Sequence, residues 1–225
     1  PPHPFWMFHR SEGMFRYLLF ILCLIPVSLF AQQTRPFTIG WLVGIEQSGP
    51  VVLQDTFYVT PTEAVSRLQQ RKITGTGGIR LEALLGGNAT LRLDVLYSDR
   101  GYQEDVRFSL SGGPEQRRTD RYRFGYLSMP FTFRIPFNEG PAFVYASGGI
   151  VTDRLLFVSN TGGPLPDDSF APWAFSWKAA LGASYPFSGE SRGFFEVSWV
   201  RGISEYRVGS DWQPQSFGLV IGYML

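Results

Sequence analysis

The chain has 225 residues, of which 44% are hydrophobic and 16% aromatic, and it carries 20 basic and 19 acidic side chains. This near-neutral balance gives no support for a nucleic-acid partner, which requires a basic surface. The single cysteine, Cys23, excludes a disulfide scaffold.

The first predicted element is an export signal over residues 14–31. Arg16 precedes an apolar run at 17–25, Pro26 breaks that run, and Ala31 is a small residue suited to cleavage. The run is shorter than the about 20 residues that a membrane-spanning helix needs. We therefore predict export with cleavage after Ala31, with an uncleaved anchor as the alternative.

Residues 1–13 precede the predicted start at Met14, and we interpret them as upstream sequence outside the gene product. The predicted mature domain, residues 32–225, contains 18 basic and 18 acidic residues and neither histidine nor cysteine. Its length fits one domain.

Eight segments of the mature chain alternate between bulky apolar residues on one face and small or polar residues on the other. In the last segment, Phe217 and Leu219 oppose Gly218 and Val220. Segments of about ten alternating residues, separated by turns, are typical of membrane barrels. The sequence predicts an all-β fold: a closed up-and-down antiparallel transmembrane β-barrel of about eight strands. The segments cover residues 37–46, 72–84, 90–100, 122–135, 142–152, 173–185, 193–201 and 216–225.

The predicted connections alternate in length, as expected when short turns face the periplasm and long loops face outward. The short ones are residues 86–89, 136–141 and 186–192, and the long ones are 47–71, 101–121, 153–172 and 202–215. In the first long connection, Thr60 and Glu63 form a capping box with Pro61 at the first helical position. We expect a short helix over residues 61–70.

The direction of the apolar face decides between two kinds of barrel. A soluble lipocalin-type barrel shows the same alternation with its apolar face inward. The opposing face is rich in Gly, Ala and Ser, which favours lipid outside and a tightly filled interior. Aromatic residues near the strand ends suit interfacial girdles; they are Trp41, Tyr97, Trp173, Tyr185 and Tyr223.

Without histidine or cysteine, the mature chain lacks a Ser-His pair, a thiolate nucleophile and the usual transition-metal ligands. We therefore expect no enzyme activity, no catalytic residue, no metal and no cofactor. An enzyme that uses carboxylates alone is the alternative. Asp167 and Asp168 are weak evidence for calcium.

Seven charged residues fall on the predicted inward faces: Arg80, Glu82, Arg92, Asp94, Arg134, Lys178 and Glu196. An eight-stranded barrel is just wide enough to be filled by its own side chains, and enclosed charges must be paired. We interpret the set as a lumenal ion-pair network that closes the bore. The alternative is the selectivity lining of a narrow pore.

Arginines cluster in the second long connection, at Arg117, Arg118, Arg121 and Arg123. Arginine pairs well with phosphate, so contact with lipopolysaccharide is one interpretation. A self-neutralised loop is the other, because acidic residues lie nearby; they are Asp99, Glu104, Asp105, Glu115 and Asp120.

The tract at 126–134, Y-L-S-M-P-F-T-F-R, resembles the Y-L-x-x-P fourth strand of the PorT-like outer-membrane β-barrel family of Gram-negative bacteria. Residues 145–149 and 181–183 resemble that family's fifth and sixth strands. The resemblance implies a single barrel domain; most members have no assigned activity, and some are tied to secretion across the outer membrane. It also implies recognition by the barrel assembly machinery, although Met224 and Leu225 follow the aromatic Tyr223 here.

The sequence therefore predicts an exported barrel in the outer membrane of a Gram-negative bacterium. Its expected partners are outer-membrane lipid, lipopolysaccharide, the assembly machinery and secretion or envelope proteins. We expect a filled lumen and a non-enzymatic scaffold or interaction role through the long loops. The alternatives are a narrow porin for small solutes and a soluble ligand-binding barrel.

Overall fold

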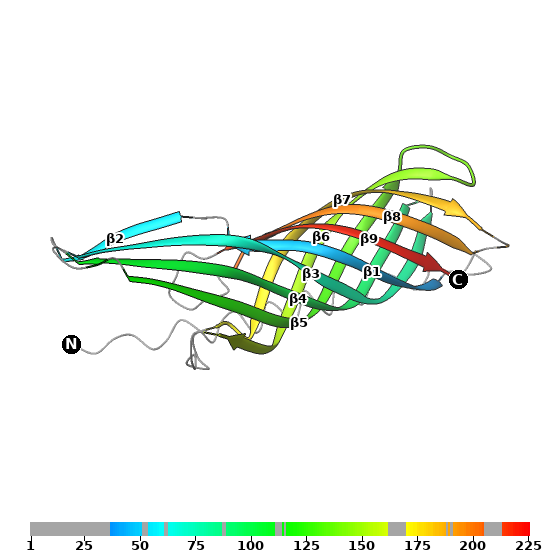
Figure 1. Ribbon diagram of the computed structural model, residues 1–225. Coiled ribbons are helices and arrows are strands. Elements are labelled where there is room, and N and C mark those ends of the chain that lie inside the picture. Colours follow the sequence, from blue (N-terminus) through cyan, green and yellow to red (C-terminus); the bar gives the residue numbers. More distant parts are fainter. Residues whose placement is uncertain are drawn as a thin grey trace, which may run out of the picture. The chain divides into compact units, whose positions relative to one another are not determined.

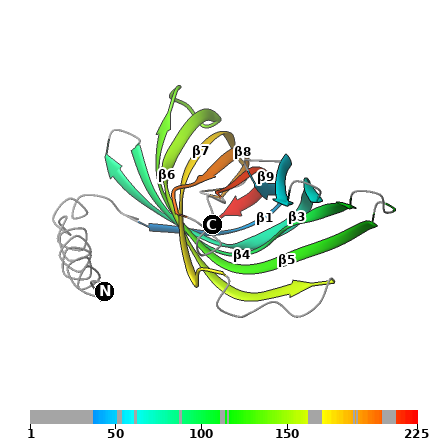
Figure 2. The same cartoon turned by 90° about the vertical axis from the view of Figure 1, so that its left-hand side faces the viewer.

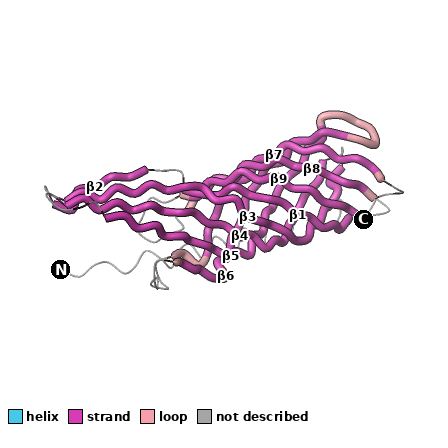
Figure 3. The backbone as a smooth tube through the Cα atoms, in the orientation of Figure 1, coloured by secondary structure: helices cyan, strands magenta, loops and turns pink. Residues whose placement is uncertain are grey.

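Antiparallel strands account for nearly all of the described chain in the computed structural model (Figures 1 and 3). They are β1 (Phe37–Pro50), β2 (Gln54–Thr60), β3 (Glu63–Gly86), β4 (Ala89–Leu110), β5 (Gln116–Pro136), β6 (Phe143–Asn160), β7 (Trp173–Pro186), β8 (Arg192–Gly202) and β9 (Pro214–Met224). No helix in the described part of the chain is long and apolar enough to cross a bilayer.

The structure describes residues 37–50, 54–60, 63–86, 89–110, 114, 116–161, 170–187, 189, 191–204 and 213–225. All of them belong to the unit Phe37–Leu225. The predicted export signal and the Asp167–Asp168 pair lie outside the described residues, and both stay predictions.

The strands close into a ring, visible from one end in Figure 2. Each strand pairs with its neighbours in the order β1-β9-β8-β7-β6-β5-β4-β3, and a pairing between β1 and β3 completes the circle. β2 pairs with residues 63–68 of β3, and β1 pairs with residues 72–83 of the same strand. β2 therefore lies along the same edge of β3 as β1, beyond the end of β1. Closure satisfies the backbone hydrogen bonds of every ring strand, as lipid requires. The predicted eight-stranded closed barrel is confirmed.

The side chains alternate with the predicted polarity. Along β7, Ala174, Ser176 and Lys178 are buried in the interior, whereas Trp177 and Leu181 point outward and are 58% and 60% exposed. On other strands, Phe133 and Leu219 are also exposed. Bulky apolar residues facing outward suit lipid and not water, so the barrel spans a membrane, and the alternative of an inward apolar face is wrong.

Charged residues bound the outward apolar belt at the end of the barrel opposite Phe37 and Leu225. The first charged residues on the outward faces of β4, β5, β6 and β8 toward this end are Asp99, Arg123, Arg154 and Arg201. β3, β4 and β5 continue well past this boundary, and β2 pairs with β3 there. Figure 1 shows β2, β3, β4 and β5 projecting beyond the other strands. This projecting sheet therefore lies outside the membrane.

The projecting sheet corrects two predictions. The expected helix over residues 61–70 is wrong, because β3 begins at Glu63 and its first residues pair with β4, from Glu63↔Leu110 to Arg71↔Tyr102. Much of the predicted connection at 101–121 is also strand. The capping box is a local signal, and cross-strand hydrogen bonding overrides it here.

Pro130, on the inward face of β5, lies at a gap in the strand pairing. The β4–β5 pairs include Leu93↔Phe131 and resume at Leu96↔Ser128, with no pair between them. Proline has no backbone N–H to donate, so this gap lets it occupy a strand interior.

Candidate functional site

All seven charged residues expected in the interior are buried within the barrel. Glu196 is 0% exposed, and Arg80, Arg92 and Asp94 are each 1% exposed. The seven come from five strands: Arg80 and Glu82 on β3, Arg92 and Asp94 on β4, Arg134 on β5, Lys178 on β7 and Glu196 on β8.

The pairing between β3 and β4 places opposite charges side by side. Arg80 lies directly opposite Asp94, and Glu82 lies directly opposite Arg92. Arg80 donates two hydrogen bonds to Asp94, of 2.7 Å from Nε and 2.8 Å from Nη2. Arg92 Nε donates to Glu82 Oε1 at 2.7 Å. Arg134 reaches Glu82 from β5, with Nη2 3.1 Å from Oε2. Two-bond contacts of this kind suit enclosed pairs.

Glu196 joins this group from the far side of the bore. Its Oε2 lies 2.9 Å from Arg92 Nη1 and 3.5 Å from Arg80 Nη1. Its Oε1 lies 3.1 Å from Lys178 Nζ, and the hydroxyl of Tyr145 donates to Oε2 at 3.3 Å. β8 and β4 are separated by three strands in either direction around the ring. The contacts of Glu196 therefore span the full width of the barrel.

Aromatic rings and glycines fill the space around these charges. The guanidinium of Arg92 lies 4.5 Å from the Tyr145 ring centroid, and that of Arg80 lies 4.4 Å from the Phe194 centroid. Gly182 faces Tyr145 so closely that a Cβ there would overlap the phenol ring. These cation–π contacts and the tight packing hold the charged groups in one arrangement.

A second charged layer, which the sequence analysis missed, lies nearer the projecting sheet. Arg100 Nη1 lies 2.6 Å from Asp153 Oδ2, and Arg100 Nε lies 3.1 Å from Glu46 Oε1. Ser98 donates to Glu46 at 3.0 Å, and Ser128 donates to Asp153. The alternation signal was available: Arg100 shares the inward face of Arg92 and Asp94. The predicted strands place Asp153 in a loop and Glu46 at a strand end, so neither is expected in the interior.

An aromatic cluster continues the filling beyond the second layer. Tyr102 and Tyr122 stack at 4.7 Å between centroids, and Phe170 meets Phe124 edge-on at 5.1 Å. Tyr126 links this cluster to the charges, because its ring lies 5.4 Å from the Arg100 guanidinium.

Little space remains inside the described barrel. A cavity of about 40 Å³ lies between the two charged layers and is lined by Lys178, Glu46 and Arg100 among others. Two further cavities, beside Arg100, have volumes of about 20 and 10 Å³. Spaces of this size accommodate single water molecules and not a solute. Within the described residues, no group of His, Cys, Asp or Glu side chains has the arrangement of a metal site.

The arginines predicted near lipopolysaccharide lie on the projecting part of β5 and are exposed. Arg118 Nε donates to Asp120 at 2.8 Å, and Arg123 Nε donates to Asp99 at 2.8 Å. The bond to Asp120 raises the pKa of Arg118 above its ordinary value. Arg118 and Arg123 therefore pair with neighbouring acids.

No family model matches the chain, and no curated protein matches it. Among solved structures, the outer membrane protein OprG from Pseudomonas aeruginosa is similar over 84% of this chain and 95% of its own, with 9% identity and a TM-score of 0.43. The outer membrane protein AlkL is similar over 87% of this chain and 94% of its own, with 12% identity and a TM-score of 0.34. The translocator domain of the autotransporter NalP from Neisseria meningitidis covers 95% of each chain, with 10% identity and a TM-score of 0.28.

The class of protein follows from the geometry above. A closed ring of eight antiparallel strands, with apolar residues outside and charges inside, defines a membrane-spanning β-barrel.

Proposed function

We propose that this chain is an outer-membrane barrel with a closed lumen, which acts without catalysis as a scaffold or interaction protein. The observation that carries the proposal is the contact of Arg92 with Glu196, which crosses the bore at 2.9 Å. With ion pairs above and below the 40 Å³ cavity, a solute has no continuous path through the described lumen. A narrow porin is the alternative, and these contacts weigh against it.

The outward belt supports placement in the outer membrane. Bacterial outer-membrane barrels have an even number of strands, short periplasmic turns and longer extracellular ends. In this chain, the turn between β5 and β6 and the turn between β7 and β8 lie at one rim, together with Phe37 and Leu225. The projecting sheet extends from the other rim. We infer that the projecting sheet faces outward from the cell.

The projecting sheet is the part of the described barrel best suited to interactions. It lies outside the apolar belt and carries the exposed arginines Arg117, Arg121 and Arg123. Such a surface suits the phosphate groups of lipopolysaccharide, because arginine pairs well with phosphate. Arg123 can contact a phosphate group while it remains paired with Asp99. Secretion or envelope proteins are the proposed macromolecular partners, in keeping with the PorT-like strand motif, and the barrel assembly machinery would insert the chain.

Location and orientation can be tested by labelling single cysteines with a membrane-impermeant maleimide. Gln116→Cys lies on the projecting sheet and Glu139→Cys lies in the opposite turn, and both positions are exposed. The proposal predicts outer-membrane fractionation, labelling of Gln116→Cys in intact cells, and labelling of Glu139→Cys only after permeabilisation. Reversed labelling would overturn the orientation, and recovery in the soluble periplasm would overturn the location.

A further inference from the structure

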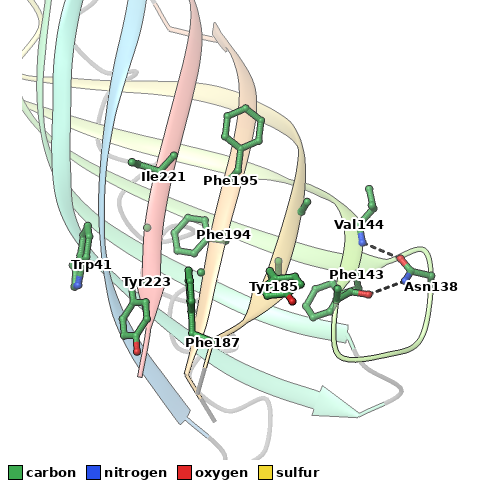
Figure 4. A pocket seen from close by; sticks show the side chains of 15 residues that line it. Trp41, Asn138, Phe143, Val144, Tyr185, Phe187, Phe194, Phe195, Ile221 and Tyr223 are labelled. Atoms are coloured by element: carbon green, nitrogen blue, oxygen red, sulfur yellow. Dashed lines mark hydrogen bonds between the residues drawn. The ribbon is translucent and has the colours of Figure 1, made fainter. Parts of the chain in front are cut away.

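A groove of about 580 Å³ lies on the barrel wall at the short-turn rim, and Figure 4 shows the side chains around it. We call it the outer groove. It extends across β6, β7, β8, β9 and β1, and its outward-facing lining includes Val144, Ala183, Tyr185, Phe195, Ile221 and Trp41. Its volume is that of a small-molecule site.

Small residues create the outer groove, and aromatic rings surround it. Gly193 pairs directly with Tyr185 on one side and with Tyr223 on the other. Phe187 lies over Gly193, where a Cβ would overlap the Phe187 ring. The Phe187 ring is 5.8 Å from that of Tyr223 and 6.4 Å from that of Tyr185. A row of three aromatic rings, Tyr185, Phe187 and Tyr223, therefore lies around Gly193, which has no side chain of its own.

We propose that the outer groove binds one acyl chain of a phospholipid in the periplasmic leaflet. This inference rests on the proposed function, because it requires the barrel to lie in the outer membrane with its short turns facing the periplasm. The occupant follows from continuity with the lipid-facing belt. Phe195 and Ile221 belong both to the groove and to the outward apolar faces of β8 and β9.

The groove recognises hydrocarbon and not head-group charge. Among the described residues that line it, none carries a charge. Its polar side chains lie at the rim, where Tyr and Trp favour the membrane interface. Asn138 is held within its own turn, donating to Ala142 O at 3.0 Å and accepting from Val144 N at 2.9 Å.

Two alanines on the outward face of β7 supply a matched pair of variants. Ala183 lines the groove, whereas Ala179, four residues along the same face, does not. Phenylalanine at either position adds the same apolar surface, but only Ala183→Phe occupies the groove. Displacement of about two buried methylene groups corresponds to about tenfold weaker binding.

The experiment is native mass spectrometry of the delipidated barrel in detergent, titrated with palmitoyl-oleoyl phosphatidylethanolamine. We expect one saturable lipid on the unmodified protein and on Ala179→Phe, and about tenfold weaker binding to Ala183→Phe. Phosphatidylglycerol should bind as tightly as phosphatidylethanolamine. Phe187→Ala, which removes an exposed ring, provides a second variant with weakened binding. Heat-modifiable gel migration checks that each variant is folded.

Three results would overturn the inference: no saturable lipid on the unmodified protein, equal weakening by both phenylalanine variants, or a strong preference for the anionic lipid. A barrel that fractionates with the outer membrane but shows any of these would leave the proposed function intact. A protein recovered in the soluble periplasm would instead overturn the proposed function itself.

Discussion

Arg92 and Glu196 meet across the centre of the barrel, 2.9 Å apart and 104 positions apart in the chain. Their strands, β4 and β8, occupy opposite places in the ring. Each side chain also pairs on its own side, Arg92 with Glu82 and Glu196 with Lys178. One contact thereby ties two halves of the barrel wall together and closes the space between them.

Glu196→Gln should strongly destabilise the barrel, because four cations would then share only Glu82 and Asp94. Removing one partner of a buried ion pair costs about 3–5 kcal/mol. Urea unfolding in detergent, followed by tryptophan fluorescence, measures the change. The control is Asp99→Asn, which breaks the half-exposed pair with Arg123 and should cost under about 1 kcal/mol. Equal costs for the two variants would contradict the role given to Glu196.

Lys178→Met should cost less than Glu196→Gln. The seven-residue network around Glu196 holds Arg80, Arg92, Arg134 and Lys178 against three acids, and Lys178 pairs with Glu196. Glu196 keeps both arginine contacts without it, so we expect a loss of about 1.5 kcal/mol, the contribution of a hydrogen bond to a charged group. The same unfolding measurement checks this order. A larger loss than that of Glu196→Gln would show that the lysine and not the carboxylate centres the network.

Gly182→Ala and Gly148→Ala should have opposite effects. A Cβ at Gly182 would lie 2.7 Å from the backbone oxygen of Phe195 and would overlap Tyr145, so overpacking should cost about 2 kcal/mol. At the outward Gly148, the nearest atom would be 3.7 Å away, and loss of backbone freedom should stabilise the barrel by about 0.5 kcal/mol. Thermal unfolding in detergent compares the two. A harmless Gly182→Ala would mean that the lumen is loosely filled.

Asp153→Asn should weaken the second layer, because Arg100 would lose the charge of a partner 2.6 Å away, although its contact with Glu46 would remain. Asp153 is 0% exposed, and its loss of charge should cost about 3 kcal/mol. Urea unfolding again gives the magnitude. A cost near zero would indicate that this layer is hydrated and does not contribute to closing the bore.

The periodicity of the sequence predicts the barrel wall well, because side chains that alternate between lipid and a packed interior leave a clear pattern. Residues such as Trp177 and Lys178 are adjacent in the chain and face opposite sides, as predicted. The pairing of Arg80 with Asp94 follows from one short turn between two neighbouring strands. Such local relationships can be read from spacing alone.

The projecting sheet could not be predicted in the same way. Gln69, Gln70 and Arg71 lie outside the apolar belt, so polar residues occupy both faces and the alternation disappears. The capping box at Thr60 then predicts a helix that pairing with β4 prevents. Contacts across the bore, such as Arg92 with Glu196, depend on the register of every strand between them, which spacing along the chain does not define.

The conductance of the purified barrel in a planar lipid bilayer tests the closed lumen most directly. The unmodified protein should show no steady current steps, because Glu196 and its partners fill the bore. Arg80→Ala, which removes the contacts with Asp94 and Glu196, should introduce steady conductance. Steady, ion-selective conductance in the unmodified protein would contradict a closed lumen and identify a narrow pore instead.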